Sequence, residues 1–365
     1  MKILHVASIK NNPFNGVCVA VPQHIIHQSE LAEVALLNII DCKIIGIEHQ
    51  YVYHKKKWKN DVEDQFKNPD IVLFHEVYHI EFAQIARDLV KEGIPYVIVP
   101  HGSLVAEAQK QKWLKKQIAN LLFFNSFIKK CEAIQCLSVN EEKNTLFNLS
   151  SFIGTNGVEI PNDSKTSFRN EGLKIVYIGR LETHSKGLDL LIETICSLKS
   201  LLIKNKVTID LYGPDNIKEW FAALGNTIQE KKIECFVCLH HAITGEEKKK
   251  VLLDSDLFIQ TSRHEGMPMG ILEAMSYGVP CLITEGTSLG DIVREYNAGW
   301  VAETNQESII LTLKRVLEEK DLLKNKSAQA RRLVMENYSW AKTSKCAVLE
   351  YESLINHKHS EMLQK

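Results

Sequence analysis

Short runs of β-branched and apolar residues recur along this chain of 365 residues, and stretches with helical periodicity separate most of them. Eight runs have the length and composition of buried strands: residues 2–8, 70–76, 95–102, 133–138, 173–180, 207–213, 256–262 and 279–284. Strands that alternate with helices build parallel sheets from β-α-β units. The sequence therefore predicts the α/β fold class, with two doubly wound sheets.

A polar passage divides the chain near its middle. Residues 158–172, VEIPNDSKTSFRNEG, combine proline, serines, asparagines and glycine, and a new buried strand follows them. A chain of this length suits two domains, each large enough for a core of its own. We therefore expect one domain over residues 1–160 and a second over 161–338, with a ligand cleft between them.

Charge and cysteine content narrow the class of protein. The formal net charge is −1, which gives no global bias toward a nucleic-acid partner. The nine cysteines are scattered and odd in number, as in proteins of a reducing compartment. The start, MKILHVASIKNNPF, is typical of a buried strand rather than a signal peptide, and no apolar run is long enough to span a membrane. We expect a cytoplasmic protein.

Two groups of metal-ligand residue types occur, and neither predicts a metal site. Cys235, Cys238, His240 and His241 fall in KIECFVCLHH, a strand-like run in which neighbouring side chains point to opposite faces. Packing of the strand therefore explains them better than zinc does. Asp254 and Asp256 form a D-x-D that we expect to close a helix and open a buried strand.

The ends of the strands carry the candidate chemistry. Ligands of open α/β sheets bind beyond the carboxyl ends of the strands, and the residues there are rich in glycine, histidine, arginine and glutamate. The dinucleotide fingerprint G-x-G-x-x-G follows the first strand of neither half. Its absence argues against a nicotinamide or flavin oxidoreductase.

Residues 263–282, RHEGMPMGILEAMSYGVPCL, predict a short helix that begins near Pro268 and ends before Gly278. Glu265 then lies in the preceding loop and Glu273 within the helix. The free N–H groups at the helix start suit a diphosphate, and Gly266 and Gly270 let it approach the chain.

The two carboxylates could accept hydrogen bonds from hydroxyl groups on either side of that diphosphate. The competing interpretation makes Glu265 a cap and Glu273 a surface residue.

A second stretch, IVYIGRLETHSKGLDLLIE, strengthens the case for an anion site. It places Arg180 and Lys186 after the first strand of the second domain and before a helix. Two fixed cations at a strand end are a natural clamp for a diphosphate leaving group. Alternatively, Lys186 is a solvated lysine, although a helix start disfavours a cation.

Taken together, these residues resemble the GT-B glycosyltransferases of family GT4. The shared features, in order, are the PHG after a strand of the first half, the TNGV near the domain boundary, G-R-L…K-G, a YGP turn, E-x7-E and the closing NYSWAKTSKCAVLEYESL. The resemblance implies two Rossmann-like domains facing across a cleft. It also implies a C-terminal helix over 339–365 that packs back toward the first domain.

The resemblance implies a role for individual residues. Glu273 would hold the ribose hydroxyls, Glu265 the hydroxyls of the donor sugar, and Arg180 with Lys186 the diphosphate. His101 would face sugar and acceptor, although it could instead only cap its loop. The remaining members of the implied substrate site are Gly16, Asn156, Gly213, Gly266, Met267 and Gly270. The chain departs from the family at Asn15 and at His241, where glycine is usual.

The implied activity is the transfer of a hexose or N-acetylhexosamine from a UDP- or GDP-sugar to a glycan, with retention at the anomeric carbon and without metal or cofactor. The acceptor would be linked to undecaprenyl diphosphate, in the synthesis of a surface polysaccharide such as O-antigen lipopolysaccharide. Two alternatives stay open: an epimerase or hydrolase of nucleotide sugars on the same fold, and a non-catalytic subunit that binds them.

One segment of the first domain suggests contact with a membrane. Residues 109–130, QKQKWLKKQIANLLFFNSFIKK, hold six lysines and no acid beside Trp113, Phe123, Phe124 and Phe127. A basic amphipathic helix can lie on anionic lipid at the inner face of the membrane, and HKKKWK at 54–59 adds charge. A helix that buries its apolar side in the core explains the pattern equally well.

Overall fold

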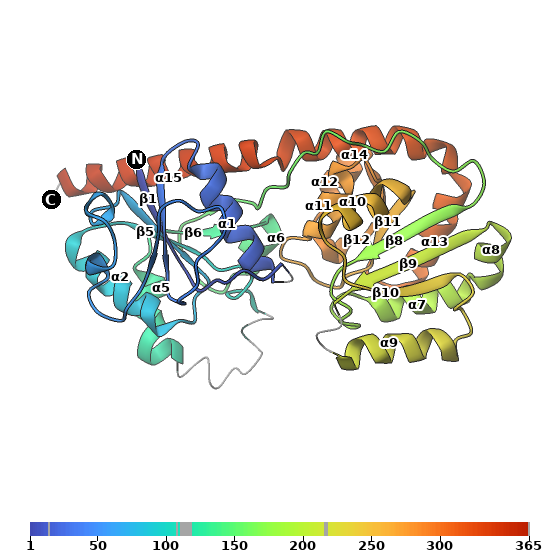
Figure 1. The fold of residues 1–365 in the computed structure, drawn as a ribbon, viewed down its shortest axis with the longest axis horizontal. Coiled ribbons are helices and arrows are strands. Elements are labelled where there is room, and N and C mark those ends of the chain that lie inside the picture. The colour runs from blue at the N-terminus through green and yellow to red at the C-terminus, as the bar shows by residue number, and fades with distance from the viewer. Residues whose placement is uncertain (14, 107–108, 110–118, 215–217, 364–365) are drawn as a thin grey trace. The chain divides into compact units, whose positions relative to one another are not determined.

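The computed structural model describes residues 1–365 apart from residues 14, 107–108, 110–118, 215–217 and 364–365. The chain forms two compact units (Figure 1). Unit 1 comprises Met1–Gly157 with Trp340–Lys365, and unit 2 comprises Val158–Ser339. Each unit is built around its own parallel sheet with helices on both faces, so the predicted α/β class is confirmed.

Unit 1 contains a seven-stranded parallel sheet in the order β3-β2-β1-β4-β5-β6-β7. Its strands are β1 (Lys2–Ala7), β2 (Glu33–Asn38), β3 (Gln50–Val52), β4 (Ile71–His75), β5 (Tyr96–Val99), β6 (Ala133–Cys136) and β7 (Ser151–Ile153). Its described helices are α1 (Gly16–Gln28), η1 (Trp58–Asn60), η2 (Asp64–Phe66), α2 (Ile80–Glu92), η3 (Asn120–Phe124), α5 (Asn125–Lys129), α6 (Val139–Asn144) and α15 (Trp340–Leu363). The strand order reverses direction between β1 and β4.

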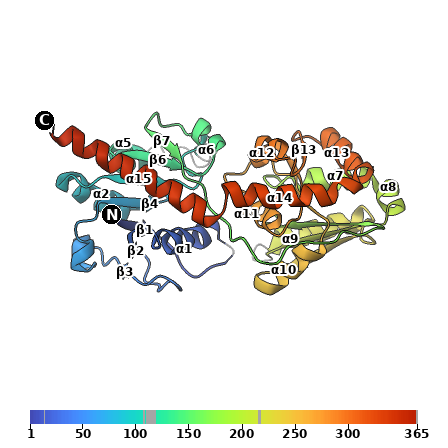
Figure 2. The same cartoon turned by 90° about the horizontal axis from the view of Figure 1, so that it is seen from above.

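The two faces of this sheet differ in chemistry. Alternate side chains such as Leu4 and Phe74 enter an apolar core with α2 and α5. The other face, with His5, His75 and Gln135, lies on the side of α1 and α15, which contact one another (Figure 2). Unit 1 therefore has one apolar layer and one layer with buried polar groups.

Unit 2 contains a six-stranded parallel sheet in the order β10-β9-β8-β11-β12-β13. Its strands are β8 (Leu173–Ile178), β9 (Val207–Gly213), β10 (Val237–His241), β11 (Leu257–Gln260), β12 (Cys281–Thr284) and β13 (Gly299–Ala302). Its described helices are α7 (Leu188–Ser197), α8 (Lys199–Lys204), α9 (Lys218–Glu230), α10 (Gly245–Asp254), α11 (Met269–Ser276), η4 (Glu285–Thr287), α12 (Gly290–Glu295), α13 (Gln306–Glu318), η5 (Lys320–Leu322) and α14 (Leu323–Asn337).

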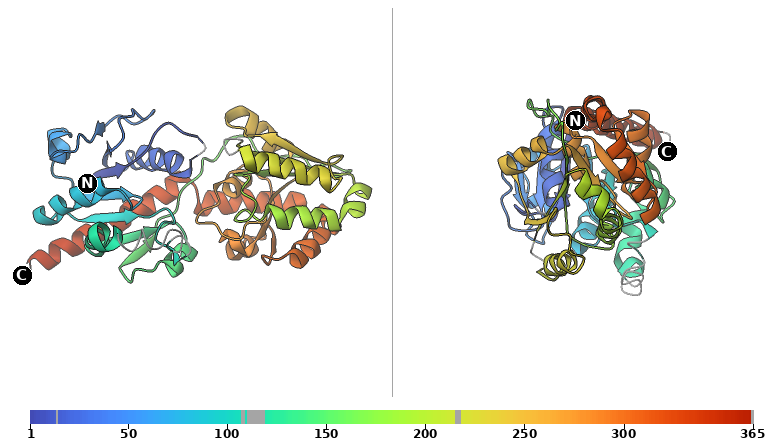
Figure 3. Two further views of the ribbon diagram at one scale, coloured as in Figure 1. Left: turned by 90° about the horizontal axis from the view of Figure 1, so that it is seen from below. Right: turned by 90° about the vertical axis from the view of Figure 1, so that its right-hand side faces the viewer.

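Strand alternation divides the helices of unit 2 between two apolar layers. Ile175 and Ile259 face α7, α8, α9 and α13, and the view from below shows α7 and α9 over this side (Figure 3). Val176 and Phe258 face α10, α11, α12 and α14. The strands are therefore buried on both faces, as their near-continuous apolar sequences predict.

The strand predictions match the structure except at the edges and at one inner strand. β3, β7 and β13 are edge strands that are too short to form a distinct apolar run in the sequence, and none of them was predicted. β2 was also missed, because LAEVALLNII does not alternate and short apolar runs fit a helix or a strand. Pairing with β1 decides its conformation.

Only the end of the segment proposed to contact lipid can be described. Residues 110–118 of the stretch 109–130, including Trp113, lie outside the described residues. Phe124 and Phe127 are buried in the apolar core of unit 1, whereas Phe123 is exposed. Two of the aromatic side chains thus serve the core. Among the described residues, no helix has both the length and the apolar character needed to cross a bilayer.

Candidate functional site

In unit 2, the candidate site forms where the strand order reverses. β8 is the first strand of this unit; β9 pairs on one of its sides and β11 on the other. The loops that follow β8 and β11 therefore leave adjacent strands in different directions, which is where open α/β sheets bind ligands. Arg180 and Lys186 lie in the first loop, and Glu265 lies in the second.

Glu265 is a buried carboxylate, and one of its two oxygens already accepts hydrogen bonds from the protein. Its Oε1 receives hydrogen bonds from Lys186 Nζ at 2.5 Å, Gln260 Nε2 at 2.7 Å and Ser262 Oγ at 2.7 Å. Within the described parts of the chain, Oε2 receives none. A carboxylate held in this way is oriented, and it keeps an oxygen that can accept hydrogen bonds from a ligand hydroxyl.

The two predicted cations differ in their surroundings. Lys186 is largely buried and forms an ion pair with Glu265, so it is not a solvated lysine. Arg180 is exposed, and no described side chain pairs with its guanidinium group. Its backbone carbonyl accepts a hydrogen bond from the buried Tyr177 hydroxyl at 2.6 Å, which fixes the chain where it leaves β8. Arg180 is therefore the cation left available to an anionic ligand.

Direct contacts hold the two loops together. Arg263 makes a two-pronged ion pair with Asp189 in the first turn of α7, at 2.7 Å for each bond, and donates to the His184 carbonyl at 2.7 Å. Gly187 has a φ of +63°, and a Cβ there would lie 1.9 Å from the Thr261 carbonyl oxygen. Only glycine fits this approach, so the spacing of the loops depends on it.

The predicted helix of the second loop is confirmed as α11, whose N-cap is Pro268. The helix ends before Gly278, and this glycine has a left-handed φ of +78°. Glu273 lies within the helix and is partly exposed. Its Oε2 forms an ion pair with Lys248 of α10. The residue is thus neither an unpaired surface glutamate nor deeply buried.

The predicted glycines fall into two groups. A Cβ at Gly213 or Gly270 would strike backbone or side-chain atoms at the end of β8, so close packing alone requires glycine at both positions. A Cβ at Gly266 or Gly16 would meet no described atom within 4 Å. Open space at these two positions fits the approach of a ligand. Met267 is half-buried and packs on the apolar layer beneath α11.

Three predicted residues belong to unit 1. His101 follows β5 with a left-handed φ of +48°, and its Nε2 lies 3.1 Å from Nδ1 of His75. Burial, followed by the charge on His24, lowers the pKa of His101 to about 3. Its ring is therefore neutral near pH 7.

Asn156 is buried and accepts a hydrogen bond from His24 Nε2 at 2.9 Å. Gly16 is the first residue of α1, which Asn15 caps by accepting hydrogen bonds from Val17 N and Cys18 N. Asparagine thus has a structural use where glycine is usual in GT4. His241, at the other departure, stacks on Phe221. The ligand roles of Asn156 and Gly16 stay predictions.

Sequence reasoning missed the side chains that support the predicted ones. Gln260 and Ser262 orient Glu265, Lys248 pairs with Glu273, and Arg263 ties the loops. Gln260 and Ser262 did leave a signal, because they are polar residues at the end of an otherwise apolar strand, shortly before Glu265. Lys248 left none, since it is one of three consecutive lysines on a solvated helix.

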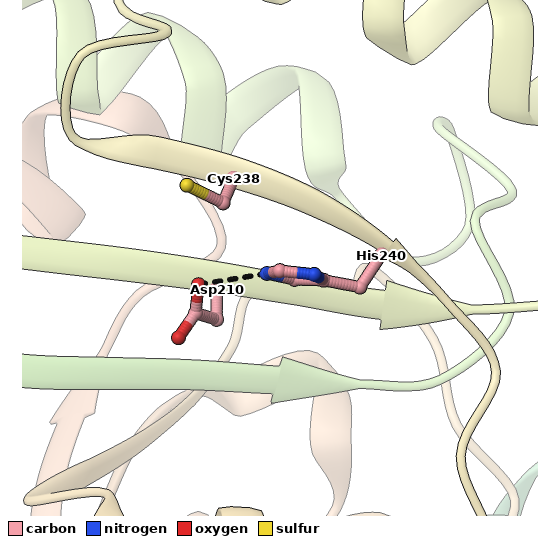
Figure 4. Close-up of side chains that lie close together, drawn as sticks. All are labelled: Asp210, Cys238 and His240. Atoms are coloured by element: carbon pink, nitrogen blue, oxygen red, sulfur yellow. Dashed lines mark hydrogen bonds and ion pairs between the residues drawn. The ribbon is translucent and has the colours of Figure 1, made fainter.

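The strand predicted from KIECFVCLHH is confirmed as β10 for its second half, Val237–His241, whereas Cys235 lies in the turn that precedes it. Cys238 and His240 share a face with Asp210 of β9 (Figure 4). His240 Nε2 lies 2.9 Å from Asp210 Oδ1, and Lys174 Nζ lies 3.3 Å from Oδ2. Burial, followed by the charge of Asp210, raises the pKa of the Cys238 thiol. The Asp210 carboxylate thus contacts both the Lys174 ammonium group and the His240 ring, and the ligand atoms of Asp210, Cys238 and His240 lie within 4.8 Å of one another.

Asp254 and Asp256 close α10 and precede β11, as predicted. Arg169 bonds to both carboxylates, at 2.7 Å for Asp254 and 2.9 Å for Asp256. Lys174 adds a bond to Asp254 at 2.8 Å. Burial alone would raise the pKa of Asp254, but these hydrogen bonds hold it below its usual value. Asp254 and Asp256 thus tie Arg169, in the segment before β8, to the start of β11.

Comparison with known proteins gives a family match for the second half of the chain. Residues 159–333 match the family model described as glycosyl transferases group 1. An uncharacterised glycosyltransferase of Methanocaldococcus jannaschii is 26% identical over 179 residues, 49% of this chain and 44% of that protein. The putative colanic acid biosynthesis glycosyltransferase WcaL of Salmonella typhimurium is 25% identical over 195 residues, 50% of this chain and 46% of its own.

A third relative is matched over a shorter stretch. An Escherichia coli protein named UDP-Gal:alpha-D-GlcNAc-diphosphoundecaprenol alpha-1,3-galactosyltransferase is 38% identical over 73 residues, 20% of this chain and 19% of its own. The matched region thus spans less than half the length of each of these three relatives.

Solved structures match the whole fold. The Anabaena protein HepE in complex with UDP has a TM-score of 0.74 at 15% identity, over 97% of this chain and 100% of that one. Sucrose-phosphate synthase from Thermosynechococcus elongatus has a TM-score of 0.72 at 12% identity, over 98% and 100%. At such low identity the likeness shows the fold alone, and that fold is shared across both units.

Proposed function

Residues 159–333 form a domain of the glycosyl transferases group 1 family within a GT-B fold, and from this premise we propose that the chain is a glycosyltransferase whose donor is a nucleoside diphosphate sugar. The observation that carries the proposal is the arrangement around Glu265. One carboxylate oxygen is held by three donors, and the other is left for a ligand, at the reversal point of the sheet. Sugar hydroxyls are donors of the kind this oxygen accepts.

The diphosphate has a matching set of positive groups. Arg180 is exposed and unpaired within the described residues, and the ammonium group of Lys186 carries three donors, of which Glu265 engages one. Both lie in the loop before α7, and Gly266 leaves open space before α11. We propose that Arg180 and Lys186 bind the diphosphate and that Glu273 binds the ribose.

The proposed transfer retains configuration and uses no metal or cofactor. The bond from the anomeric carbon to the diphosphate oxygen breaks, and its electron pair stays on the diphosphate. The acceptor oxygen bonds to the same face of that carbon, and its proton passes to the departing diphosphate. Arg180 and Lys186 stabilise the charge that develops on the leaving group, which is the largest contribution such a site can make. Glu265 orients the sugar and forms no bond to it.

The relatives guide the choice of substrates. HepE was solved with UDP, and the E. coli relative is named for UDP-galactose and a diphosphoundecaprenol-linked sugar. The Salmonella relative is named for colanic acid biosynthesis. We propose transfer of a hexose or N-acetylhexosamine from a UDP- or GDP-sugar to a lipid-linked glycan in surface polysaccharide synthesis, by a cytoplasmic protein that meets its acceptor at the inner membrane face.

A ligand screen followed by one substitution tests the proposal. The purified chain is warmed with UDP-, GDP- and other nucleotide sugars, and a binder raises the melting temperature. With the best donor and a lipid-linked glycan acceptor, Glu265→Ala should lower transfer at least ~100-fold, the scale for losing one preorganised polar contact. Glu295→Ala, at an exposed position of α12, is the matched control.

Three outcomes would overturn the proposal. Full turnover by the Glu265→Ala variant would remove Glu265 from the site. Rapid consumption of the donor without acceptor would identify an epimerase or hydrolase. Tight donor binding with no transfer to any of a panel of glycan acceptors would identify a binding subunit.

A further inference from the structure

A chain of buried imidazoles runs inward from His101. His101 Nε2 lies 3.1 Å from His75 Nδ1, and His75 Nε2 lies 2.8 Å from His5 Nδ1. The last hydrogen bond of this row of imidazoles joins His5 Nε2 to Oε1 of Gln28, 3.0 Å away. These residues come from the loop after β5, the strands β4 and β1, and the helix α1, all within unit 1.

Neutral imidazoles in such a chain must all point the same way. Burial is the main cause that lowers the pKa of each of the three histidines, to about 3 for His5 and His101 and well below its usual value for His75. A neutral imidazole has one nitrogen that donates and one that accepts. Every hydrogen bond of the chain therefore follows from the direction of the first.

A backbone carbonyl sets that direction from the far end. Gln135 Nε2 donates to the Gly154 carbonyl at 2.9 Å, and a carbonyl can only accept. Gln135 Oε1 is thereby left to accept the Tyr351 hydroxyl proton at 2.6 Å. The hydroxyl proton is then committed, and the Tyr351 oxygen can only accept from its remaining neighbour, Gln28.

Gln28 lies between the row of imidazoles and the Tyr351–Gln135 pair. Burial raises the pKa of the Tyr351 hydroxyl, and hydrogen bonding with Gln28 and Gln135 lowers this pKa in part. Nε2 of Gln28 is a buried donor that no described group satisfies at full hydrogen-bond geometry. If the amide were flipped, its oxygen would face a hydroxyl whose proton is committed. Nε2 therefore belongs beside Tyr351, and Oε1 accepts from His5.

We infer that Gln28, His5 and His75 hold His101 in the tautomer that is protonated on Nε2, so that its Nδ1 presents a lone pair. Nδ1 of His101 has no hydrogen-bond partner among the residues described. A group that binds there must donate a hydrogen bond, which selects a hydroxyl and repels a phosphate oxygen. Given the proposed function, His101 contacts a hydroxyl of the sugar or acceptor rather than the diphosphate, and the other three are positioning residues.

The tautomer can be measured without any assay of transfer. Nitrogen NMR of the full chain with ¹⁵N-labelled histidine distinguishes protonated from unprotonated ring nitrogens, and His101→Gln identifies the His101 signals. We expect Nε2 protonated and Nδ1 unprotonated at pH 7.5. A proton on Nδ1, or on both nitrogens, would overturn the inference whatever the protein's activity.

Substitution of Gln28 tests whether the chain sets the tautomer. Gln28→Leu removes the terminal acceptor and should give His101 a mixture of tautomers, whereas Gln23→Leu, on the same helix, should not. If Gln28→Leu does not fold, Tyr351→Phe removes a single hydroxyl and should also loosen the preference. An unchanged His101 spectrum in the folded variant would show that Gln28, His5 and His75 do not set the tautomer of His101.

Ligand binding tests the consequence of the tautomer. Gln28→Leu should weaken binding of a UDP-sugar, and its kcat/KM, about 5-fold, the change that corresponds to ~1 kcal/mol for one hydrogen bond, while binding of UDP alone is unchanged. Equal loss for UDP and UDP-sugar would place His101 at the diphosphate and contradict the inference. If no nucleotide sugar binds to the wild-type chain, the proposed function fails, and the NMR result decides the inference by itself.

Discussion

At the scale of the residue, two glycines of unit 2 serve different ends. Gly187 is required by the fold, because its φ is +63° and a Cβ would meet the Thr261 carbonyl oxygen at 1.9 Å. Gly266 has no described atom within 4 Å of the place where a Cβ would stand. The same substitution at the two positions should therefore separate stability from binding.

Gly187→Ala should destabilise unit 2 by about 2 kcal/mol or more, from the left-handed backbone and the steric clash. Urea unfolding monitored by the fluorescence of the buried Trp300 measures the change. Gly225→Ala, in the helix α9 with only ordinary contact at 3.7 Å, is a control that should not destabilise. Wild-type stability of Gly187→Ala would contradict the close approach of the two loops.

Gly266→Ala should leave the free energy of unfolding within about 0.5 kcal/mol of wild type, because the added methyl group would have no described atom within 4 Å. It should weaken binding of the nucleotide sugar, since the methyl group would stand where we propose that the donor approaches the chain. Calorimetric titration of both proteins measures the effect. Equal affinity would remove Gly266 from the site.

At the scale of the element, Arg263 joins the loop after β11 to the start of α7. Arg263→Ala should lower stability by only about 1 kcal/mol, because the ion pair with Asp189 is partly exposed. Donor affinity should fall about 5-fold, since the loop that carries Arg180 and Lys186 loses its tie.

Donor titration and urea unfolding of Arg263→Ala measure the two effects separately. Arg315→Ala breaks an exposed ion pair within α13 and should cost stability on a similar scale without change in affinity. An affinity loss of equal size in both variants would mean that general destabilisation, rather than the position of the loop, is responsible.

At the scale of the whole molecule, the buried histidines make the stability of unit 1 depend on pH. Burial lowers the pKa of His5 and His101 to about 3 and of His24 to about 4, whereas the unfolded chain takes up these protons near pH 6.5. Stability from neutral histidines is therefore complete above about pH 7 and is lost as pH falls toward 4. Each histidine contributes on the order of 1.4 kcal/mol per pH unit in that window.

Urea unfolding at pH 7.5, 6 and 5 should show a steep fall in the free energy of unfolding. His24→Gln should reduce the slope, because one buried histidine no longer titrates. His184→Gln, at an exposed position of unit 2, is the control. A free energy of unfolding that stays level from pH 7.5 to 5 would contradict the burial of these rings as neutral groups.

Apart from β2, the sequence predicted the inner strands, because they are buried on both faces and carry unbroken apolar runs. It also predicted α11, since Pro268 and Gly278 mark the start and end of a helix by backbone geometry alone. Edge strands β3 and β7 are too short to carry an unbroken apolar run. The lysine partners of the two glutamates are remote in sequence: Lys186 lies 79 residues from Glu265, and Lys248 lies 25 residues from Glu273.

The sequence by itself determined the fold class, the family of unit 2 and the positions of Glu265, Glu273, Arg180 and Lys186 relative to strands and helices, because these follow from local spacing. Only the tertiary structure decided that one oxygen of Glu265 is committed and that His101 ends a chain of buried imidazoles. Hydrogen-bond direction and burial depend on groups that meet through folding, such as Gly154 and Tyr351, and no spacing along the chain records them.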